Sequence, residues 1–138
     1  MQDKYYYPLI CTDRFSKTVA FYEDHFGFIV GKENPYYALL CHPDNQDVRI
    51  AIIDMDSPAL PKEAKQKTTG LVINFPVEDI RAVYQQYYWE GLDLCGDPKE
   101  DCNGDQHFFV CDPNGVYINV LEKIEPDNCC PEDELMTA

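Results

Sequence analysis

The sequence predicts an α+β fold in which one unit, strand–helix–strand–strand–strand, occurs twice. Two helical segments, residues 12–28 and 77–92, divide the chain into similar halves. Each follows one alternating, strand-like run and precedes three more. Residues 36–54 also align without gaps on residues 104–122, at a shift of 68 positions. The repeated order and the ungapped overlay together indicate duplication of one module.

These boundaries predict a single domain with an internal repeat. We expect module 1 at about residues 4–56, a linker at 57–67 and module 2 at about 68–124. The remaining residues, 125–138, form an acidic tail. A chain of 138 residues is long enough to bury one proper core.

The first module begins with the strand-like run YYYPLIC, residues 5–11, which leads into the first helix. The helix has Thr12 or Asp13 as its candidate N-cap and Gly27 as its stop signal. Its apolar residues recur at helical spacing and define one buried face: Phe15, Val19, Tyr22 and Phe26.

The second module repeats this arrangement. The run GLVINFPV, residues 70–77, predicts its first strand, and the following helix has Asp79 near its start and Gly91 at its end. The two helices align at a shift of about 64 or 65 positions, so a longer loop at CGDPKEDCN, residues 95–103, absorbs the difference. The helix buries a similar apolar face: Ile80, Val83, Tyr84 and Tyr87.

The last hairpin carries the clearest local signal. Asp-Pro-Asn-Gly at residues 112–115 predicts a tight turn, because proline fixes φ and Asn-Gly tolerates left-handed backbone. A three-residue turn with a glycine bulge would pair Asp112 with Val116. That register places His107 and Phe109 on the same side of the sheet as Asn119.

Charge and composition exclude several functions. The chain has 25 acidic and 11 basic residues, a net charge of −14, which disfavours nucleic acid and anionic membranes as partners. The same charge permits a cationic ligand, although it also serves solubility. No apolar run is long enough to span a membrane, and MQDKYYYPL lacks the features of a signal peptide. We therefore expect a cytoplasmic protein.

The seven cysteines predict neither a disulfide framework nor a zinc site. Their number is odd, and no Cys-x-x-Cys spacing occurs. We expect incidental or structural thiols. No phosphate loop, dinucleotide fingerprint or nucleophile elbow is present, so we expect no cofactor.

The paired modules, AFYEDHFGF at residues 20–28 and DPNGVYINVLE at residues 112–122 resemble the vicinal oxygen chelate superfamily. That superfamily includes glyoxalase I, extradiol dioxygenases, fosfomycin-resistance enzymes and bleomycin-resistance proteins. The resemblance covers about residues 5–124. It implies a curled, mostly antiparallel sheet around a cleft with the helices outside, and a homodimer. It specifies a fold more than a function, because this scaffold supports unrelated chemistries.

The resemblance also locates the metal-ligand positions, on the first and last strands of each module. They fall on Tyr7, Ala51, Val72 and Asn119. Valine and alanine cannot bind a metal, and a neutral amide is a poor ligand. We therefore expect the usual metal site to be absent, as in the bleomycin-resistance branch. A displaced site built from His42, His107 and carboxylates remains an alternative.

The expected cleft presents aromatic and polar side chains that suit a small organic ligand. Asn119 has two interpretations, as a ligand contact or as a partner of protein neighbours such as Tyr7 or Asn74. His107 is a candidate general base, although a lone strand histidine more often has a structural role. The candidate ligand-binding residues are Tyr7, Arg49, Asn74, His107, Phe109, Tyr117 and Asn119.

Three functions follow. The first is a binding protein for a small organic, cationic or aromatic ligand, without catalysis. The second is a lyase, isomerase or dioxygenase-type enzyme with relocated metal ligands or with His107 as a metal-free base. The third is a structural or regulatory module whose cleft is filled by its own side chains.

Overall fold

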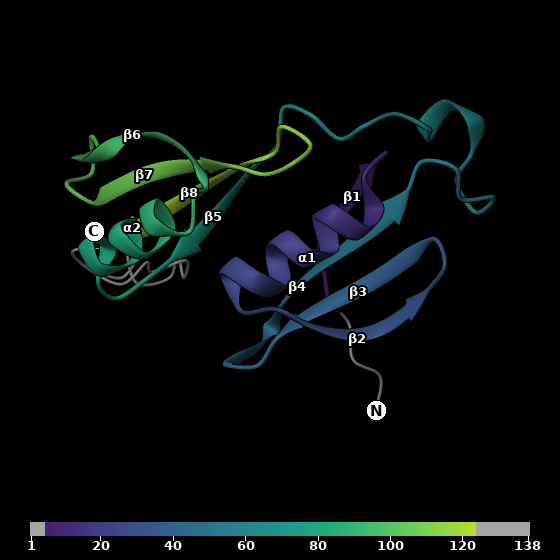
Figure 1. Cartoon of the computed structure of the whole chain (residues 1–138), viewed down its shortest axis with the longest axis horizontal. Coiled ribbons are helices and arrows are strands. Elements are labelled where there is room, and N and C mark those ends of the chain that lie inside the picture. Colours follow the sequence, from purple (N-terminus) through teal and green to yellow (C-terminus); the bar gives the residue numbers. More distant parts are fainter. Residues whose placement is uncertain (1–4, 124–138) are drawn as a thin grey trace, which may run out of the picture. The chain divides into compact units, whose positions relative to one another are not determined.

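The computed structural model describes residues 5–123, and its helices and strands follow the predicted order (Figure 1). The first half contains β1 (Leu9–Thr12), α1 (Phe15–Phe26), β2 (Ile29–Asn34), β3 (Tyr37–His42) and β4 (Asn45–Asp54). A short 3-10 helix, η1 (Lys62–Ala64), lies in the connection. The second half contains β5 (Val72–Pro76), α2 (Ile80–Trp89), β6 (Asp93–Glu100), β7 (Gln106–Cys111) and β8 (Tyr117–Glu122). The predicted repeat of strand, helix and three strands is confirmed.

Each half forms its own four-stranded sheet, and the two sheets have equivalent strand orders. The first is β1-β4-β3-β2 and the second is β5-β8-β7-β6. In the first sheet β1 runs parallel to β4, with Leu9 opposite Ala51, and the other pairs are antiparallel. Leu39 also lies opposite Ala51, and Cys41 lies opposite Arg49. The α+β class and the mixed, mostly antiparallel sheets are therefore confirmed.

The chain divides into two compact units whose limits differ from those of the sequence repeat. Among the described residues, unit 1 comprises 5–73 with 111–118, and unit 2 comprises 74–110 with 119–123. The tip of the β7–β8 hairpin thus belongs to unit 1, because its buried side chains bond to β1 and α1.

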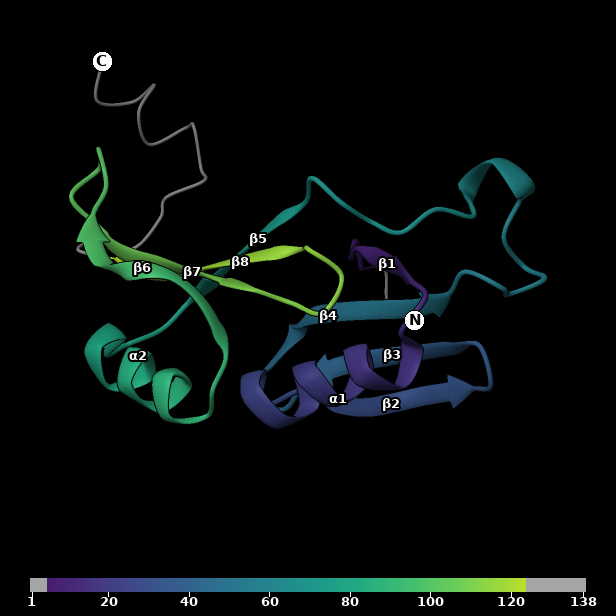
Figure 2. The same cartoon turned by 45° about the horizontal axis from the view of Figure 1, so that its top comes forward.

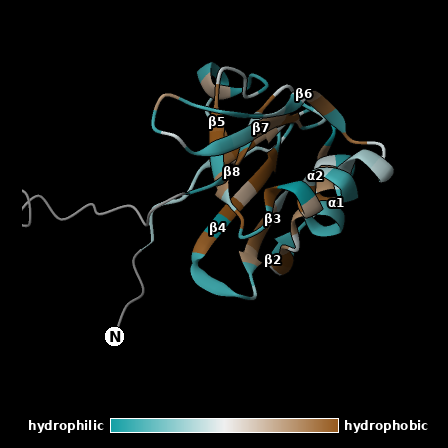
Figure 3. Cartoon of the chain, turned by 90° about the vertical axis from the view of Figure 1, so that its left-hand side faces the viewer, coloured by the Kyte–Doolittle hydropathy of each residue, from teal (hydrophilic) through white to brown (hydrophobic). Residues whose placement is uncertain are grey.

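In unit 1, α1 lies along the sheet of β2, β3 and β4 (Figure 2). Hydrophobic residues are concentrated on the strands (Figure 3). The fully buried side chains of this core include Ile10, Tyr22 and Ile52. Gly27 ends α1 with a left-handed φ of 76°, as predicted. The start differs from the prediction: Arg14 is the N-cap, because Thr12 instead bonds to Asn114 and accepts from the Arg14 N–H.

In unit 2, Asp79 is the N-cap of α2, as predicted, and its side chain accepts from the Ala82 N–H at 3.2 Å. The helix packs on the sheet through Tyr84 and Tyr87, whose ring centroids lie 5.1 and 6.3 Å from that of Phe108. Successive strand residues point to opposite faces. The helix therefore covers the face opposite to the one that His107 and Phe109 occupy.

The cysteines of the described residues are free thiols: Cys11, Cys41, Cys95, Cys102 and Cys111. Cys11 is buried in unit 1, and burial raises the pKa of its thiol. No helix between residues 5 and 123 is long and apolar enough to cross a membrane. The predicted acidic tail lies outside the described residues.

Candidate functional site

Three polar side chains form a hydrogen-bonded row across β5, β8 and β7 of the second sheet. His107 Nδ1 lies 3.0 Å from Asn119 Oδ1, and Asn119 Nδ2 lies 3.0 Å from Asn74 Oδ1. Asn74 is exposed, whereas Asn119 and His107 are half-buried. The row is thus reachable from solvent along one sheet face, and we call it the amide–imidazole row.

The hydrogen bonds of this row fix the orientation of each member. An amide oxygen only accepts hydrogen bonds, so His107 donates through Nδ1–H to Asn119. In neutral imidazole this leaves a lone pair on Nε2. At the other end, the Asn74 amide nitrogen has two N–H donors. The row therefore offers an acceptor at the His107 end and a donor at the Asn74 end.

One aromatic side chain, Phe109, packs beside the row. The Phe109 ring meets the His107 ring edge-on, with centroids 5.4 Å apart and planes at 72°. Tyr117 is 41% exposed and lies two positions before Asn119 on β8, hence on the same side of that strand. The predicted register of the hairpin is confirmed, because Asp112 N–H donates to the Val116 carbonyl at 2.8 Å. This pairing is what brings His107 onto the side of Asn119.

The two remaining candidate residues, Tyr7 and Arg49, lie in unit 1, as Tyr117 also does. Tyr7 precedes β1 by two residues and is 39% exposed. It hydrogen-bonds to Tyr37, and burial together with this bond raises the pKa of Tyr37. Arg49 holds its guanidinium carbon 3.8 Å from the Tyr5 ring centroid, a cation–π contact. Its Nε–H also donates to the Gln46 carbonyl at 3.2 Å. Both candidates are therefore positioned by contacts within unit 1.

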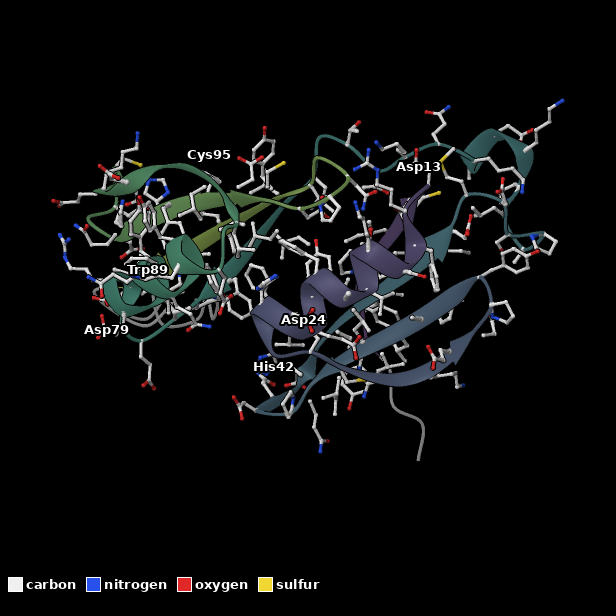
Figure 4. All side chains as sticks on the ribbon, viewed as in Figure 1. Asp13, Asp24, His42, Asp79, Trp89 and Cys95 are labelled. Atoms are coloured by element: carbon white, nitrogen blue, oxygen red, sulfur yellow. The ribbon has the colours of Figure 1, made fainter. Side chains whose placement is uncertain are left out.

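The residues at the positions where the resemblance places metal ligands do not fit a divalent ion. Ala51 is 1% exposed and has only a methyl group, and Val72 has only alkyl atoms. Asn119 already uses its oxygen to accept from His107 and its nitrogen to donate to Asn74. His42 contacts the Phe26 carbonyl at 3.1 Å, near the end of α1 (Figure 4). Within residues 5–123, no group of three or more His, Cys, Asp or Glu side chains is arranged to hold a metal.

A buried polar cluster at the hairpin tip was not predicted from the sequence. Asp112 accepts from the Tyr22 hydroxyl at 2.8 Å and from the backbone N–H groups of Asn114 and Val116. The Asn114 side chain bonds to the hydroxyls of Thr12 and Thr18. The signal for the turn was visible in Asp-Pro-Asn-Gly, but its distant partners carry no sequence signature. This cluster fixes the hairpin from which β8 starts.

The arrangement of elements and the family match decide the classification. The sequence model of the Glyoxalase/Bleomycin resistance protein/Dioxygenase superfamily matches residues 5–120. The chain belongs to this superfamily. The resemblance drawn from AFYEDHFGF and DPNGVYINVLE is thereby confirmed at the level of the superfamily. No curated protein matches the sequence.

Solved structures of superfamily members share this fold at low sequence identity. A glyoxalase/bleomycin resistance protein/dioxygenase from Nocardioides has a TM-score of 0.72 at 14% identity, covering 94% of this chain and 89% of that one. A superfamily member from Sphaerobacter thermophilus has a TM-score of 0.71 at 19% identity, covering 88% and 98%. A lactoylglutathione lyase from Agrobacterium tumefaciens has a TM-score of 0.67 at 16% identity, covering 88% and 94%. These identities support the shared fold alone.

Proposed function

We propose that this superfamily member binds a small organic ligand against the amide–imidazole row, without the metal site of its metal-dependent relatives. The observation that supports this is the hydrogen-bonded chain His107–Asn119–Asn74 on an accessible sheet face. The row holds an acceptor and a donor in fixed positions, and such pre-organisation reduces the cost of ordering side chains on binding. Phe109 supplies apolar surface beside the polar groups.

The ligand chemistry follows from the charge of the chain and from the groups of the row. None of the three row side chains is anionic, so the row itself suits a neutral polar group. The net charge of −14 adds a long-range attraction for cations. We therefore propose a small organic ligand with a hydrogen-bonding group and an aromatic or cationic part.

The test is a thermal-shift screen with a panel of neutral and cationic aromatic compounds, followed by calorimetric titration of each hit. Asn119→Leu removes the centre of the row and is expected to weaken binding at least tenfold. Asn103→Ala, an exposed loop substitution, is the matched control and leaves binding unchanged. A compound that binds should also shift the imidazole NMR signals of His107. A ligand that binds Asn119→Leu as tightly as the wild type would contradict the proposal, and so would a panel without hits.

A second function, enzymatic proton transfer, is favoured by the same hydrogen bond. A general base needs an oriented lone pair, and the Asn119 oxygen orients the His107 ring in that way. The reaction class would be abstraction of a proton from a bound carbon acid, as in a lyase or isomerase. The assay is deuterium incorporation into a bound hit in D₂O. His107→Gln is expected to abolish exchange while the ligand still binds, and exchange that persists in His107→Gln excludes this role.

A further inference from the structure

Unit 2 has a concave surface on the sheet face opposite to the amide–imidazole row. It lies between α2 and β6, is open to solvent and has a volume of about 390 Å³. Its lining combines aromatic, acidic and apolar side chains: Tyr84, Tyr88, Leu92, Asp93, Leu94 and Asp97. Figure 4 shows Trp89 on α2 and Cys95 on β6, the two elements that form its walls. We call it the α2–β6 groove.

The groove has the volume of a small-molecule site, and its lining is about equally polar and apolar. Its volume falls within the range of roughly 300–1,000 Å³ that is typical of ligand pockets. The Tyr84 and Tyr88 rings are 6.5 Å apart between centroids and inclined by 32°, so they form one aromatic wall. Tyr88 remains 62% exposed, and the neighbouring Trp89 is 83% exposed. This aromatic surface has no covering segment among residues 5–123.

The charges of the groove are all negative. Asp93 and Asp97 line it, and no basic side chain does. The Tyr84 hydroxyl donates to Asp97 Oδ1 at 2.8 Å, which holds the carboxylate in place. Within residues 5–123 the other oxygen of Asp97 makes no hydrogen bond. The C-terminal half of α2 adds the negative end of the helix dipole. Arg81 lines an adjoining hollow that shares Tyr84 and Asp97 with this groove, and Lys99 follows Asp97 by two residues on β6.

We propose that the α2–β6 groove binds a small organic cation, with an ammonium, amidinium or guanidinium group at Asp97 and Asp93 and an apolar part against Tyr84 and Tyr88. Aromatic faces attract cations through their quadrupole, and an amidinium or guanidinium can bond a carboxylate through two parallel N–H groups. A second copy of this chain is a poor occupant, because it carries the same net charge of −14. This site is separate from the proposed function, because α2 covers the sheet face opposite to His107.

The experiment uses benzamidinium as the probe and neutral benzamide as its isostere. Trp89 is the only tryptophan of the chain and its ring contacts Tyr88 edge-on at 6.0 Å, so its fluorescence reports on the groove. Benzamidinium is expected to change the fluorescence of Trp89 along a saturable binding curve and to shift the backbone amide NMR signals of residues 91–97. Benzamide is expected to bind at least fivefold more weakly.

Matched variants locate the cation. Asp97→Asn keeps the shape of an exposed side chain and is expected to weaken benzamidinium about threefold to fivefold, the effect typical of an exposed charge pair. Asp24→Asn, an exposed aspartate on α1, changes nothing. Benzamidinium shifts at residues 91–97, without shifts at Asn74, His107 and Asn119, separate this site from the amide–imidazole row. The proposal is overturned if benzamide binds as well as benzamidinium, if Asp97→Asn binds like the wild type, or if residues 91–97 show no shifts.

Discussion

The hydrogen bond between Tyr22 and Asp112 is expected to be among the larger polar contributions to stability in unit 1. Tyr22 is 1% exposed, and its hydroxyl donates to the Asp112 carboxylate at 2.8 Å. Tyr22→Phe removes this donor and little else. The ring keeps its aromatic neighbours Phe21, Phe26 and Phe28, whose centroids lie 5.1, 6.0 and 6.1 Å away. The substitution therefore isolates the hydroxyl.

The expected magnitude follows from the partners of Asp112. A hydrogen bond to a charged group contributes about 1.5–3 kcal/mol to stability. Asp112 Oδ1 still accepts from the Asn114 and Val116 backbone N–H groups in the variant, so the carboxylate loses only one of its hydrogen bonds. We expect a loss of about 2 kcal/mol in the free energy of unfolding. At roughly 3 °C per kcal/mol for a chain of this size, Tm falls by about 6 °C.

Urea unfolding followed by circular dichroism measures this loss, and an unchanged m value shows that the folded core is retained. Tyr36→Phe, at an exposed tyrosine, is the control and shifts stability by less than about 0.5 kcal/mol. A double-mutant cycle with Asp112→Asn is expected to give a coupling energy of about 1 kcal/mol or more. A loss below about 0.5 kcal/mol in Tyr22→Phe, or additive effects in the cycle, would refute the reasoning.

Four further outcomes follow from single features. Burial, together with the Asp112 charge, raises the pKa of Tyr22. The urea midpoint of the wild type should therefore decline as pH rises above about 10, and that of Tyr22→Phe should decline less steeply. Equal declines with pH in the two proteins would contradict this. Asp79→Ala removes the α2 N-cap and is expected to cost about 1 kcal/mol in urea unfolding, whereas no loss would mean that the cap contributes nothing. Gly115→Ala places a Cβ at a φ of 92° and is expected to lower stability in urea unfolding by about 1–2 kcal/mol; an unchanged urea midpoint would contradict this. Elemental analysis of protein purified without chelator should find no stoichiometric metal, and added nickel, zinc, manganese or iron should leave Tm unchanged; one metal per chain would overturn the interpretation of Asn119.

Local sequence signals predicted the elements well, because each depends on neighbours along the chain. The turn at residues 112–115 determined the pairing of Asp112 with Val116, and that pairing placed His107 beside Asn119. Asp79 was found as a cap for the same reason, since its partner Ala82 lies three residues away. Such contacts are readable because their spacing is fixed by backbone geometry.

Contacts between distant residues were predicted only in part. Asn74 was one of two expected protein partners for Asn119, whereas the bond from His107 was not expected. Thr12 was one of two predicted N-caps for the first helix, but its hydroxyl bonds to Asn114, 102 residues later. A threonine before a helix suits either role, and only the packed structure decides between them.

The duplicated hairpins show why the roles of polar residues escape a sequence repeat. Asp44 and Asp112 occupy equivalent positions, and both suit a turn, because short polar side chains bond to nearby backbone N–H groups. In the first hairpin Asp44 is exposed, and its backbone N–H bonds to His42. In the second, Asp112 is buried, and the Tyr22 hydroxyl bonds to it. The local requirement for aspartate is shared, so the alignment cannot reveal which copy has gained a distant partner. The difference depends on α1, which supplies Tyr22 to the second hairpin, and thereby anchors the start of the strand that carries Asn119.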